Sequence, residues 1–418
     1  MKVHVFVDIE GRTHLAGHLY TDQRRGRLTS VFAYDDSYLT DPAAYPIDPA
    51  LPLGRGTWPS TSTLPRAILD ASPDRWGRTL IARRAAAEDA AAGRPTRTLS
   101  DLDHVLGVSD ATRHGALRFA FEPDGPYQHP GEDVPPSVTL PALADAARQV
   151  GDESQAAPDA VRMLLGVGSA SLGGARPKAS VQDGARLRIA KFAHSHDDWD
   201  VMAWEATALD LAERAGITVP IRQLLTVEGS SVLLLDRFDR TDAGHRIGYM
   251  SALTLCQASD GDRGDYLDIA ESLAAVSADP KTDLAELWRR IAYGAAINNT
   301  DDHLRNHGVL RQGRGWRLSP AFDMNPDPHV TATHATSVAG AATGPTVMSA
   351  LISAAPRFGL RADRVRQELR VLLQAVSRWD GVAATHHVSR DERARFAPVF
   401  ESGTESVRQG LAAVVQGG

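Results

Sequence analysis

The chain has 418 residues, of which 43% are hydrophobic and 23% are charged, and its formal net charge is −7. This composition is typical of a globular protein with room for two or three domains, and the acidic balance does not support nucleic acid or an anionic membrane as the main partner. The one cysteine, Cys256, excludes an intrachain disulfide and a cysteine-based zinc site. We expect a cytoplasmic protein with no membrane partner. No apolar run approaches the roughly 20 residues of a membrane helix, and the first residues alternate like a strand instead of forming a signal peptide.

The first third of the chain predicts a β-meander followed by helices. Residues 1–35 alternate between apolar and polar side chains, with Val3, Val5 and Val7 on one face. Further along, Pro73 could open a helix with Ser72 as its cap.

Residues 124–137 are rich in proline, glycine and acidic side chains, which makes them the best linker candidate. We therefore expect an N-terminal subdomain over 1–123, a second part over 138–240 and a mostly helical part over 241–418.

A glycine-rich stretch follows the second part's first helix. Gly168, Ser169, Ala170 and Ser171 belong to a G-x-G-x-x-S pattern, in which flexible glycines let backbone N–H groups turn towards a phosphate chain. The stretch is not a Walker A loop, because G-x-x-x-x-G-K-[ST] is absent. A flexible surface loop is the alternative.

A lysine and a glutamate come next at informative positions. Lys191 shares one face of the strand predicted over 187–192 with two aliphatic side chains. It could pair with nucleotide phosphates, or it could be the charged residue that protects an edge strand. Glu205, which we place in the first turn of a helix over 201–215, is the natural partner of Lys191, although a first-turn glutamate also favours the helix dipole without any partner.

The next predicted hairpin, over 221–235, ends in Asp236, Arg237 and Phe238. In a kinase order of elements, these residues fall where the hinge between the lobes would meet adenine.

The most informative stretch is 299–307, to which a helix over 284–296 leads. Asp283 and Glu286 predict a capping box at the start of that helix. Asp301 and Asn306 then form D-x-x-x-x-N, the spacing of a kinase catalytic loop, in which the carboxylate accepts a hydroxyl proton and the amide oxygen binds magnesium. Asp323, after a predicted hairpin over 309–318, would be the second metal ligand. The spacing also occurs by chance, so a polar helix end that runs into a loop is the alternative.

Near the C-terminus, Val365, Leu369, Leu372, Val376 and Trp379 are spaced as one buried helix face. The chain is thus β-rich, then β with one helix, then helical. This order predicts an α+β protein with a two-lobed kinase-like fold: a β-rich N-lobe with an added N-terminal β/α subdomain, and a mostly helical C-lobe.

Several short motifs in this order resemble those of HipA-type toxin kinases. They are S-x-x-G-A-x-x-K at 171–178, the strand lysine, R-F-D-R at 237–240, T-D-x-H-x-x-N at 300–306 and F-D-M at 322–324. P-D-x-W-G-R at 73–78 and the run 114–119 resemble that family's N-terminal subdomain, so the resemblance spans essentially the whole chain. D-x-H-x-x-N also looks like the catalytic loop of phosphatidylinositol kinases.

The resemblance implies an ATP- and Mg²⁺-dependent serine/threonine protein kinase that is the toxin of a bacterial type II toxin–antitoxin pair. It implies a HipB-like helix-turn-helix antitoxin as partner, with operator DNA bound only through that antitoxin, and a protein substrate such as an aminoacyl-tRNA synthetase. Ser171 matches the serine that the family autophosphorylates, and Ser169 resembles a second such site. Gln257 is a further candidate for contact with ATP, and we expect Asp302 to be solvated.

Two other functions stay open. One is a metal-dependent hydrolase, because His303 and His307 are four residues apart with Asp301, Asp302 and Asp323 nearby in the sequence. The other is a catalytically silent co-repressor or binding module that uses the kinase fold as a scaffold.

Overall fold

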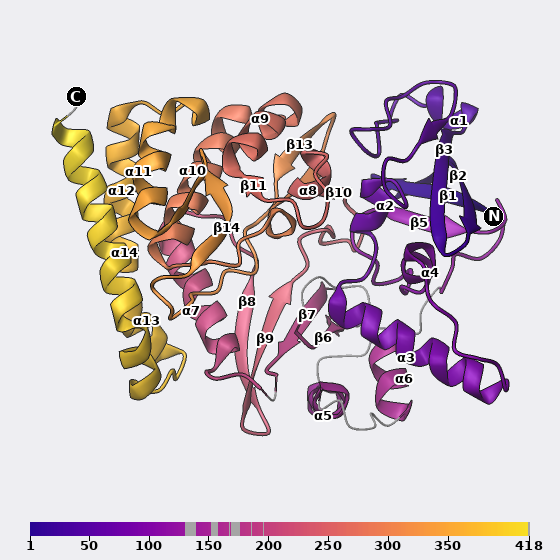
Figure 1. Ribbon diagram of the computed structural model, residues 1–418, viewed down its shortest axis with the longest axis horizontal. Coiled ribbons are helices and arrows are strands. Elements are labelled where there is room, and N and C mark those ends of the chain that lie inside the picture. The colour runs from indigo at the N-terminus through magenta and orange to yellow at the C-terminus, as the bar shows by residue number, and fades with distance from the viewer. Residues whose placement is uncertain are drawn as a thin grey trace. The chain divides into compact units, whose positions relative to one another are not determined.

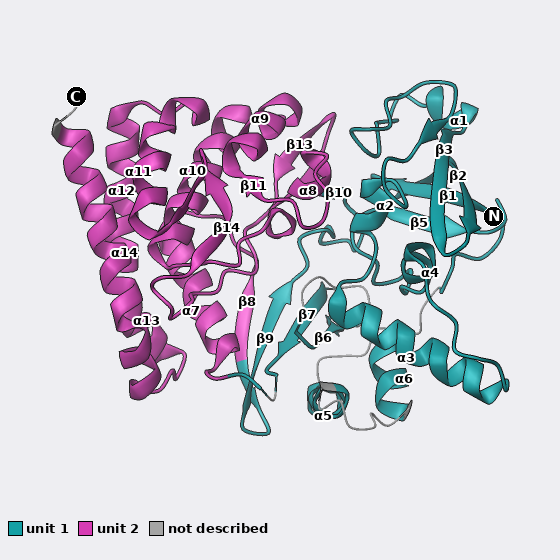
Figure 2. Cartoon of the chain, in the orientation of Figure 1, with its two compact units in different colours: residues 1–197, 225–250 teal, residues 198–224, 251–418 magenta. Residues whose placement is uncertain are grey.

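The computed structural model describes residues 1–129, 139–151, 158–166, 168, 176–184, 186–194 and 196–416. Contacts divide the chain into two compact units (Figure 2): unit 1 comprises 1–197 and 225–250, and unit 2 comprises 198–224 and 251–418. The three-part division at 1–123, 138–240 and 241–418 stays a prediction.

The first sheet of unit 1 is antiparallel and has the order β4-β3-β2-β1-β5 (Figure 1). Val3, Val5 and Val7 are fully buried, as their alternation predicts. The strands are β1 (Lys2–Ile9), β2 (Arg12–Arg24), β3 (Arg27–Tyr34), β4 (Trp58–Pro59) and β5 (Leu117–Ala120). The helices beside it in sequence are α1 (Asp36–Leu39), α2 (Arg66–Asp70), α3 (Arg75–Ala91) and α4 (Asp101–Leu106).

Helix α3 begins two residues later than the sequence predicts. Its N-cap is Asp74, whose side chain accepts a hydrogen bond of 2.8 Å from the backbone N–H of Gly77. The prediction that Ser72 caps a helix opened by Pro73 is therefore wrong. A carboxylate satisfies the free N–H groups of a first turn as well as a hydroxyl does, and it adds a favourable charge.

The second sheet of unit 1 has the order β6-β7-β9-β8. Its strands are β6 (Lys178–Asp183), β7 (Arg186–Phe192), β8 (Arg222–Val227), where the chain passes from unit 2 into unit 1, and β9 (Ser230–Asp236). Side chains of α3, of α5 (Leu140–Gly151) and of α6 (Pro158–Gly166) form one apolar core with alternate residues of this sheet, among them Ala190 and Leu234. Because neighbours along a strand point to opposite faces, Lys191 lies on the face away from that core.

Unit 2 is mostly helical. Its helices are α7 (Val201–Arg214), α8 (Ala252–Leu255), α9 (Tyr266–Val276), α10 (Pro280–Ala296), α11 (Gly344–Ser353), α12 (Ala362–Val376), α13 (Trp379–Thr385) and α14 (Arg390–Gln416), with 3₁₀ turns at Leu304–Asn306 and Ala355–Phe358. The hairpin β12 (Gly308–Gln312) and β13 (Gly315–Leu318) confirms the predicted one, and β11 (Gly264–Asp265), β14 (Thr333–Val338) and β15 (Ala341–Thr343) form a small sheet. Strand β10 (Tyr249–Ser251) lies where the chain passes from unit 1 into unit 2.

Two details of the predicted helices are corrected in unit 2. The N-cap of α10 is Asp279, whose side chain accepts from the N–H of Thr282 at 3.2 Å. Asp283 is instead buried and accepts from Arg317 Nε at 3.0 Å, so the predicted capping box does not form. The buried face predicted near the C-terminus is confirmed on α12, but Trp379 opens the next helix, α13.

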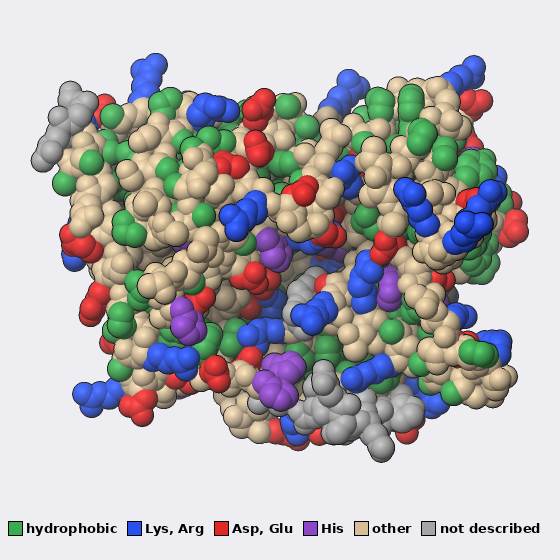
Figure 3. Space-filling model, viewed as in Figure 1, with side chains coloured by type: hydrophobic (Ala, Val, Ile, Leu, Met, Phe, Trp, Pro, Cys, Tyr) green, Lys and Arg blue, Asp and Glu red, His purple; other side chains and the backbone are tan. Residues whose placement is uncertain are grey.

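None of the helices in the described ranges combines the length and the apolar character that a membrane crossing requires. On the face drawn in Figure 3, charged side chains of both signs are interspersed among the described residues.

Candidate functional site

The loop that follows α10 starts with a reversal of the chain. Asn298 adopts a left-handed backbone conformation, with φ 55°, and Asn299 N–H bonds back to the carbonyl of Gly294 at 2.8 Å. Asparagine tolerates this conformation better than most residues, which allows the helix to end abruptly. Asp301 and Asn306 therefore lie in a loop of unit 2 whose start is fixed by this hydrogen bond.

Asp301 and Asn306 meet across this loop. Asn306 is buried, and its Nδ2 donates a hydrogen bond of 3.0 Å to the backbone carbonyl of Asp301, whose side chain is exposed. Since the amide nitrogen is used in this bond, the Oδ1 of Asn306 is the atom left for a metal ion.

Asp323 lies close enough to Asp301 to change its protonation. Partial burial of its carboxyl group is the largest effect and raises the pKa of Asp301; His303 opposes it, and the negative charges of Asp323 and then Asp302 raise the pKa further. Asp323 also has a left-handed backbone, with φ 58°, and such conformations in non-glycine residues are concentrated at functional sites. One amide oxygen and neighbouring carboxylates form the hard oxygen donor set that Mg²⁺ prefers, so these residues fit that ion.

Asp302 is buried, and the prediction that it is solvated is wrong. Its carboxylate accepts hydrogen bonds from Tyr266 Oη and from His307 Nε2, the latter at 3.1 Å. Burial raises the pKa of Asp302, but His307 and Tyr266 together outweigh burial and lower it, so the group is ionised. The sequence signal that could have found this bond is His307, which lies five residues after Asp302 and which we considered as a metal ligand together with His303.

The bond between His307 and Asp302 also argues against the metal-dependent hydrolase. His307 is buried against Asp302 while His303 is exposed, so the two imidazoles do not face one ion. The segment between them is a 3₁₀ turn and not an α-helix, which removes the geometry that a four-residue spacing assumes. Within the described residues, no group of three or more His, Cys, Asp or Glu side chains could hold a metal ion.

The segment after Asp323 is attached to the start of the catalytic loop. Asn298 Nδ2 donates to the carbonyl of Asp327 at 2.8 Å, and Thr300 Oγ1 donates to the Asp327 carboxylate at 2.8 Å. Between them, Asn299 Oδ1 accepts from the N–H of Asn325 at 3.2 Å. Three consecutive residues thus hold both segments together within unit 2.

In unit 1, Lys191 lies on an inner strand of the second sheet and is buried. The edge-strand explanation of this lysine is therefore wrong. Lys178 is directly opposite it on β6, and two like charges in that position destabilise a sheet unless they are compensated. Asp74 compensates one of them, because its Oδ2 lies 3.0 Å from Lys178 Nζ. Sequence reasoning gave no role to Asp74 or Lys178 beyond the family motifs that contain them.

Glu205 lies in unit 2 and is 1% exposed. It comes after the first turn of α7, whose N-cap is Asp200, so the explanation from the helix dipole does not apply. A buried carboxylate needs compensation, and its pairing with Lys191 stays a prediction.

In the predicted adenine-binding segment, Asp236 and Arg237 form hydrogen bonds within unit 1. Asp236 accepts from Arg188 Nε at 2.6 Å. Arg237 is buried, its N–H donates to the carbonyl of Leu187 at 3.1 Å, and its side chain binds Asp239. Arg237 therefore has a structural role, and adenine binding by Asp236, Arg237 and Phe238 stays a prediction.

Nucleotide binding also stays a prediction for the other candidate residues. Gln257 is exposed just after α8 and has a left-handed backbone, φ 54°. Gly168 is also left-handed, with φ 69°, whereas Ser169, Ala170 and Ser171 lie outside the described residues.

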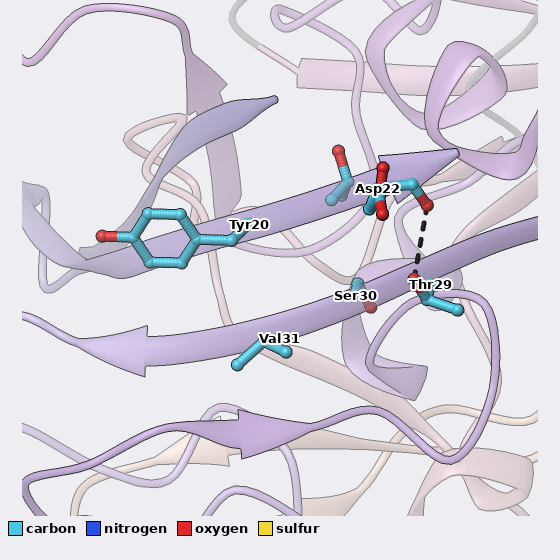
Figure 4. Close-up of a pocket in the computed structure, with 6 residues that line it drawn as sticks. Tyr20, Asp22, Thr29, Ser30 and Val31 are labelled. Atoms are coloured by element: carbon cyan, nitrogen blue, oxygen red, sulfur yellow. Dashed lines mark hydrogen bonds between the residues drawn. The ribbon is translucent and has the colours of Figure 1, made fainter. Parts of the chain in front are cut away.

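A shallow cavity of about 180 Å³ lies over β2 and β3 (Figure 4). It is lined by Tyr20, Thr21, Asp22, Thr29, Ser30 and Val31, and Thr29 Oγ1 donates to the Asp22 carbonyl at 3.3 Å. None of the predicted site residues lines it.

Two family models match the chain: the HipA N-terminal domain over residues 7–100 and the HipA-like C-terminal domain over residues 170–379. The second spans half of the chain. The protein belongs to the HipA family.

Two curated relatives are Y4mE and Y4dM of Sinorhizobium fredii, both named as proposed kinases. Each is 28% identical to this chain, over 131 and 135 residues, which is 29% of this chain and 31% and 32% of the relatives. The chain thus matches about a third of the length of these relatives.

A solved structure of HipA from Shewanella oneidensis MR-1, determined with HipB and operator DNA, matches 99% of this chain and 98% of its own, with a TM-score of 0.65 and 14% identity. This likeness confirms the predicted α+β, two-lobed kinase-like fold.

Proposed function

We propose that this HipA-family chain is an ATP- and Mg²⁺-dependent serine/threonine protein kinase and the toxin of a bacterial toxin–antitoxin pair. Family membership supports the proposal. The observation that carries it is the grouping of Asp301, Asn306 and Asp323 in one loop region of unit 2.

In this proposal, the Asp301 carboxylate orients the serine or threonine hydroxyl of the substrate and accepts its proton as the oxygen attacks the γ-phosphate and ADP leaves. The raised pKa of Asp301 suits it to this role, because a stronger base takes the proton more readily. Asn306 Oδ1 and Asp323 would hold Mg²⁺, which supplies positive charge to the phosphate oxygens.

The remaining candidate residues complete the proposal. Lys191 neutralises the ATP phosphates, with Glu205 as its orienting partner. The backbone at Asp236, Arg237 and Phe238 binds adenine, with Gln257 close to the nucleotide, and the glycine-rich stretch from Gly168 covers the phosphates.

We further propose a HipB-like helix-turn-helix antitoxin as the partner, with operator DNA bound through it. The support is the solved HipA neighbour, which was determined with HipB and operator DNA. The proposed substrate is a protein of translation such as an aminoacyl-tRNA synthetase. Autophosphorylation of Ser171 or Ser169 would add about two negative charges each where the ATP phosphates bind, and would switch the kinase off.

The experiment is intact-mass measurement of dephosphorylated wild type and Asp301→Asn after incubation with ATP and Mg²⁺. We expect wild type to gain phosphate at Ser169 or Ser171 and Asp301→Asn to gain none while it still binds ATP. Asp363→Asn, which neutralises a highly exposed carboxylate at the start of α12, is the matched control and should behave as wild type.

Growth arrest on expression of wild type, and normal growth with Asp301→Asn, would support the toxin role. If wild type binds ATP but transfers no phosphate to itself or to proteins of a bacterial lysate, the kinase proposal fails. If Asp301→Asn arrests growth as wild type does, a catalytically silent module replaces it.

A further inference from the structure

The feature that the proposed reaction leaves unexplained is the buried carboxylate of Asp302, beside the catalytic Asp301. Asp302 is 6% exposed, and both donors to its carboxylate, Tyr266 and His307, are also buried. Its backbone carbonyl accepts from Thr336 Oγ1 at 2.6 Å. A carboxylate is costly to bury, and well-packed apolar side chains could fill such a space at least as well. Its presence therefore calls for a role that an apolar side chain could not fill.

The positions of the bonded residues indicate that role. Asp302 follows Asp301 in the chain, and His307 follows Asn306. The bond from His307 Nε2 to Asp302 therefore closes the loop directly behind the two proposed site residues. The bond from Asn306 Nδ2 to the Asp301 carbonyl closes the same loop at the site itself. Two cross-links, one residue apart, set the separation of Asp301 from Asn306.

Tyr266 and Gly264 attach this closed loop to the rest of unit 2. Tyr266 is the first residue of α9, and its hydroxyl donates to the same carboxylate oxygen that faces His307. Gly264, two residues earlier, lies against Leu304 so closely that a Cβ there would lie 2.6 Å from the leucine side chain. The loop is thus held both from α9 and from β11.

We propose that Asp302, joined to Tyr266 and His307, is the positioning residue of the catalytic loop, which holds Asp301 and Asn306 at their working separation. The inference rests on the proposed kinase function, because it gives the reason for the fixed separation. The carboxylate accepts from both donors, and its negative charge makes both hydrogen bonds stronger than those to a neutral acceptor, which explains why a carboxylate is present here.

The first test compares two buried tyrosines. Tyr266→Phe removes the hydroxyl that binds Asp302, and Tyr293→Phe removes a hydroxyl that donates to the Ala208 carbonyl elsewhere in unit 2. Both tyrosines are buried, so both variants should lose similar stability. We expect Tyr266→Phe to lower kcat by about tenfold or more, because small misplacements of reacting groups are that costly. KM for ATP should stay near the wild-type value, and Tyr293→Phe should keep the wild-type kcat.

The second test is rescue by a conservative variant. Among the described residues, His307 Nδ1 has no hydrogen-bond partner, so Nε2 is the ring atom whose loss matters. His307→Gln can still offer an N–H to Asp302, whereas His307→Leu cannot. We expect the glutamine variant to recover most of the kcat that the leucine variant loses. Equal losses in both variants would overturn the proposal.

A third measurement does not depend on activity. Hydrogen exchange followed by mass spectrometry should show faster exchange of the amides at 301–307 in Tyr266→Phe, and wild-type exchange there in Tyr293→Phe. If the two variants match in kcat and in exchange, Asp302 has only a structural role and the proposal is wrong. If wild type transfers no phosphate but the exchange difference is present, the proposed function fails while the positioning of the loop stands.

Discussion

The sharpest prediction concerns stability and comes from a buried carboxylate in unit 1, Asp239, which is 1% exposed. Its oxygens accept from Arg237 Nε at 2.8 Å, from Arg240 Nη1 at 2.8 Å and from the backbone N–H of Gly115 at 2.8 Å. Both guanidinium groups are themselves buried, with 1% and 7% of the side chains exposed. One negative charge therefore compensates two positive ones in a place that water does not reach.

Asp239→Asn keeps the shape of the side chain and removes its charge. One amide oxygen cannot accept from all of these donors, and the amide N–H₂ group would face guanidinium N–H groups. Removal of one partner of a buried ion pair costs about 3–5 kcal/mol, because the remaining charge stays buried and uncompensated. We expect a loss of that size in the free energy of unfolding.

The assay is urea-induced unfolding followed by circular dichroism, with Asp22→Asn as the matched control. Asp22 also pairs with an arginine, Arg24, at 2.7 Å, but both side chains are more than half exposed. Exposed pairs of this kind contribute about 0–1 kcal/mol, so the control should unfold close to wild type. If Asp239→Asn unfolds at the same urea concentration as wild type, the account of this network is wrong.

Two further predictions concern unit 1. Burial lowers the pKa of His114 to about 4 from its usual 6.5, so between those pH values the unfolded chain binds more protons than the folded one. The stability contributed by neutral His114 is present above pH 6.5 and is lost as pH falls towards 4, and the loss amounts to about 2 kcal/mol at pH 5. We expect His114→Gln to remove this part of the acid sensitivity, which urea unfolding at pH 7 and pH 5 would measure. Second, Lys178→Met and Asp74→Asn should each lower the free energy of unfolding, because each breaks the ion pair between them. In a double-mutant cycle, the double variant should lose less than the sum of the two single losses, with a coupling of about 0.5–3 kcal/mol. Strictly additive losses would contradict the ion pair.

Patterns that act over a few residues predicted most of the fold. The alternation in 1–35, the hairpin over 309–318 and the spacing along α12 each depend on neighbours in the sequence, and all three are confirmed. The start of α10 could have been found in the same way. Asp279 directly precedes Pro280, and an acidic cap followed by proline in the first turn is a stronger signal than the D-x-x-E pattern that begins at Asp283.

The errors at the site have a different cause, because they depend on partners far away in the chain. Asp302 stands between two polar residues, a pattern typical of a solvated loop, and its burial depends in part on the hydroxyl of Tyr266, 36 residues earlier. The residues around Lys191 were also consistent with an edge strand. The pairing of β7 with β9 places Lys191 on an inner strand. Neither partner can be identified from the residues beside these two.

The R-F-D-R motif shows how two separate motifs become one structural element. From 237–240, the guanidinium groups of Arg237 and Arg240 donate to the carbonyl of Arg113, and Asp239 accepts from the N–H of Gly115. Arg113 directly precedes the run 114–119, and Gly115 lies within it. This run is the other motif of the family resemblance, about 125 residues earlier in the chain. Charged side chains in one motif thus satisfy backbone groups in the other. This bonding explains why 225–250 belongs to the same compact unit as the N-terminal residues, although the chain passes through unit 2 in between.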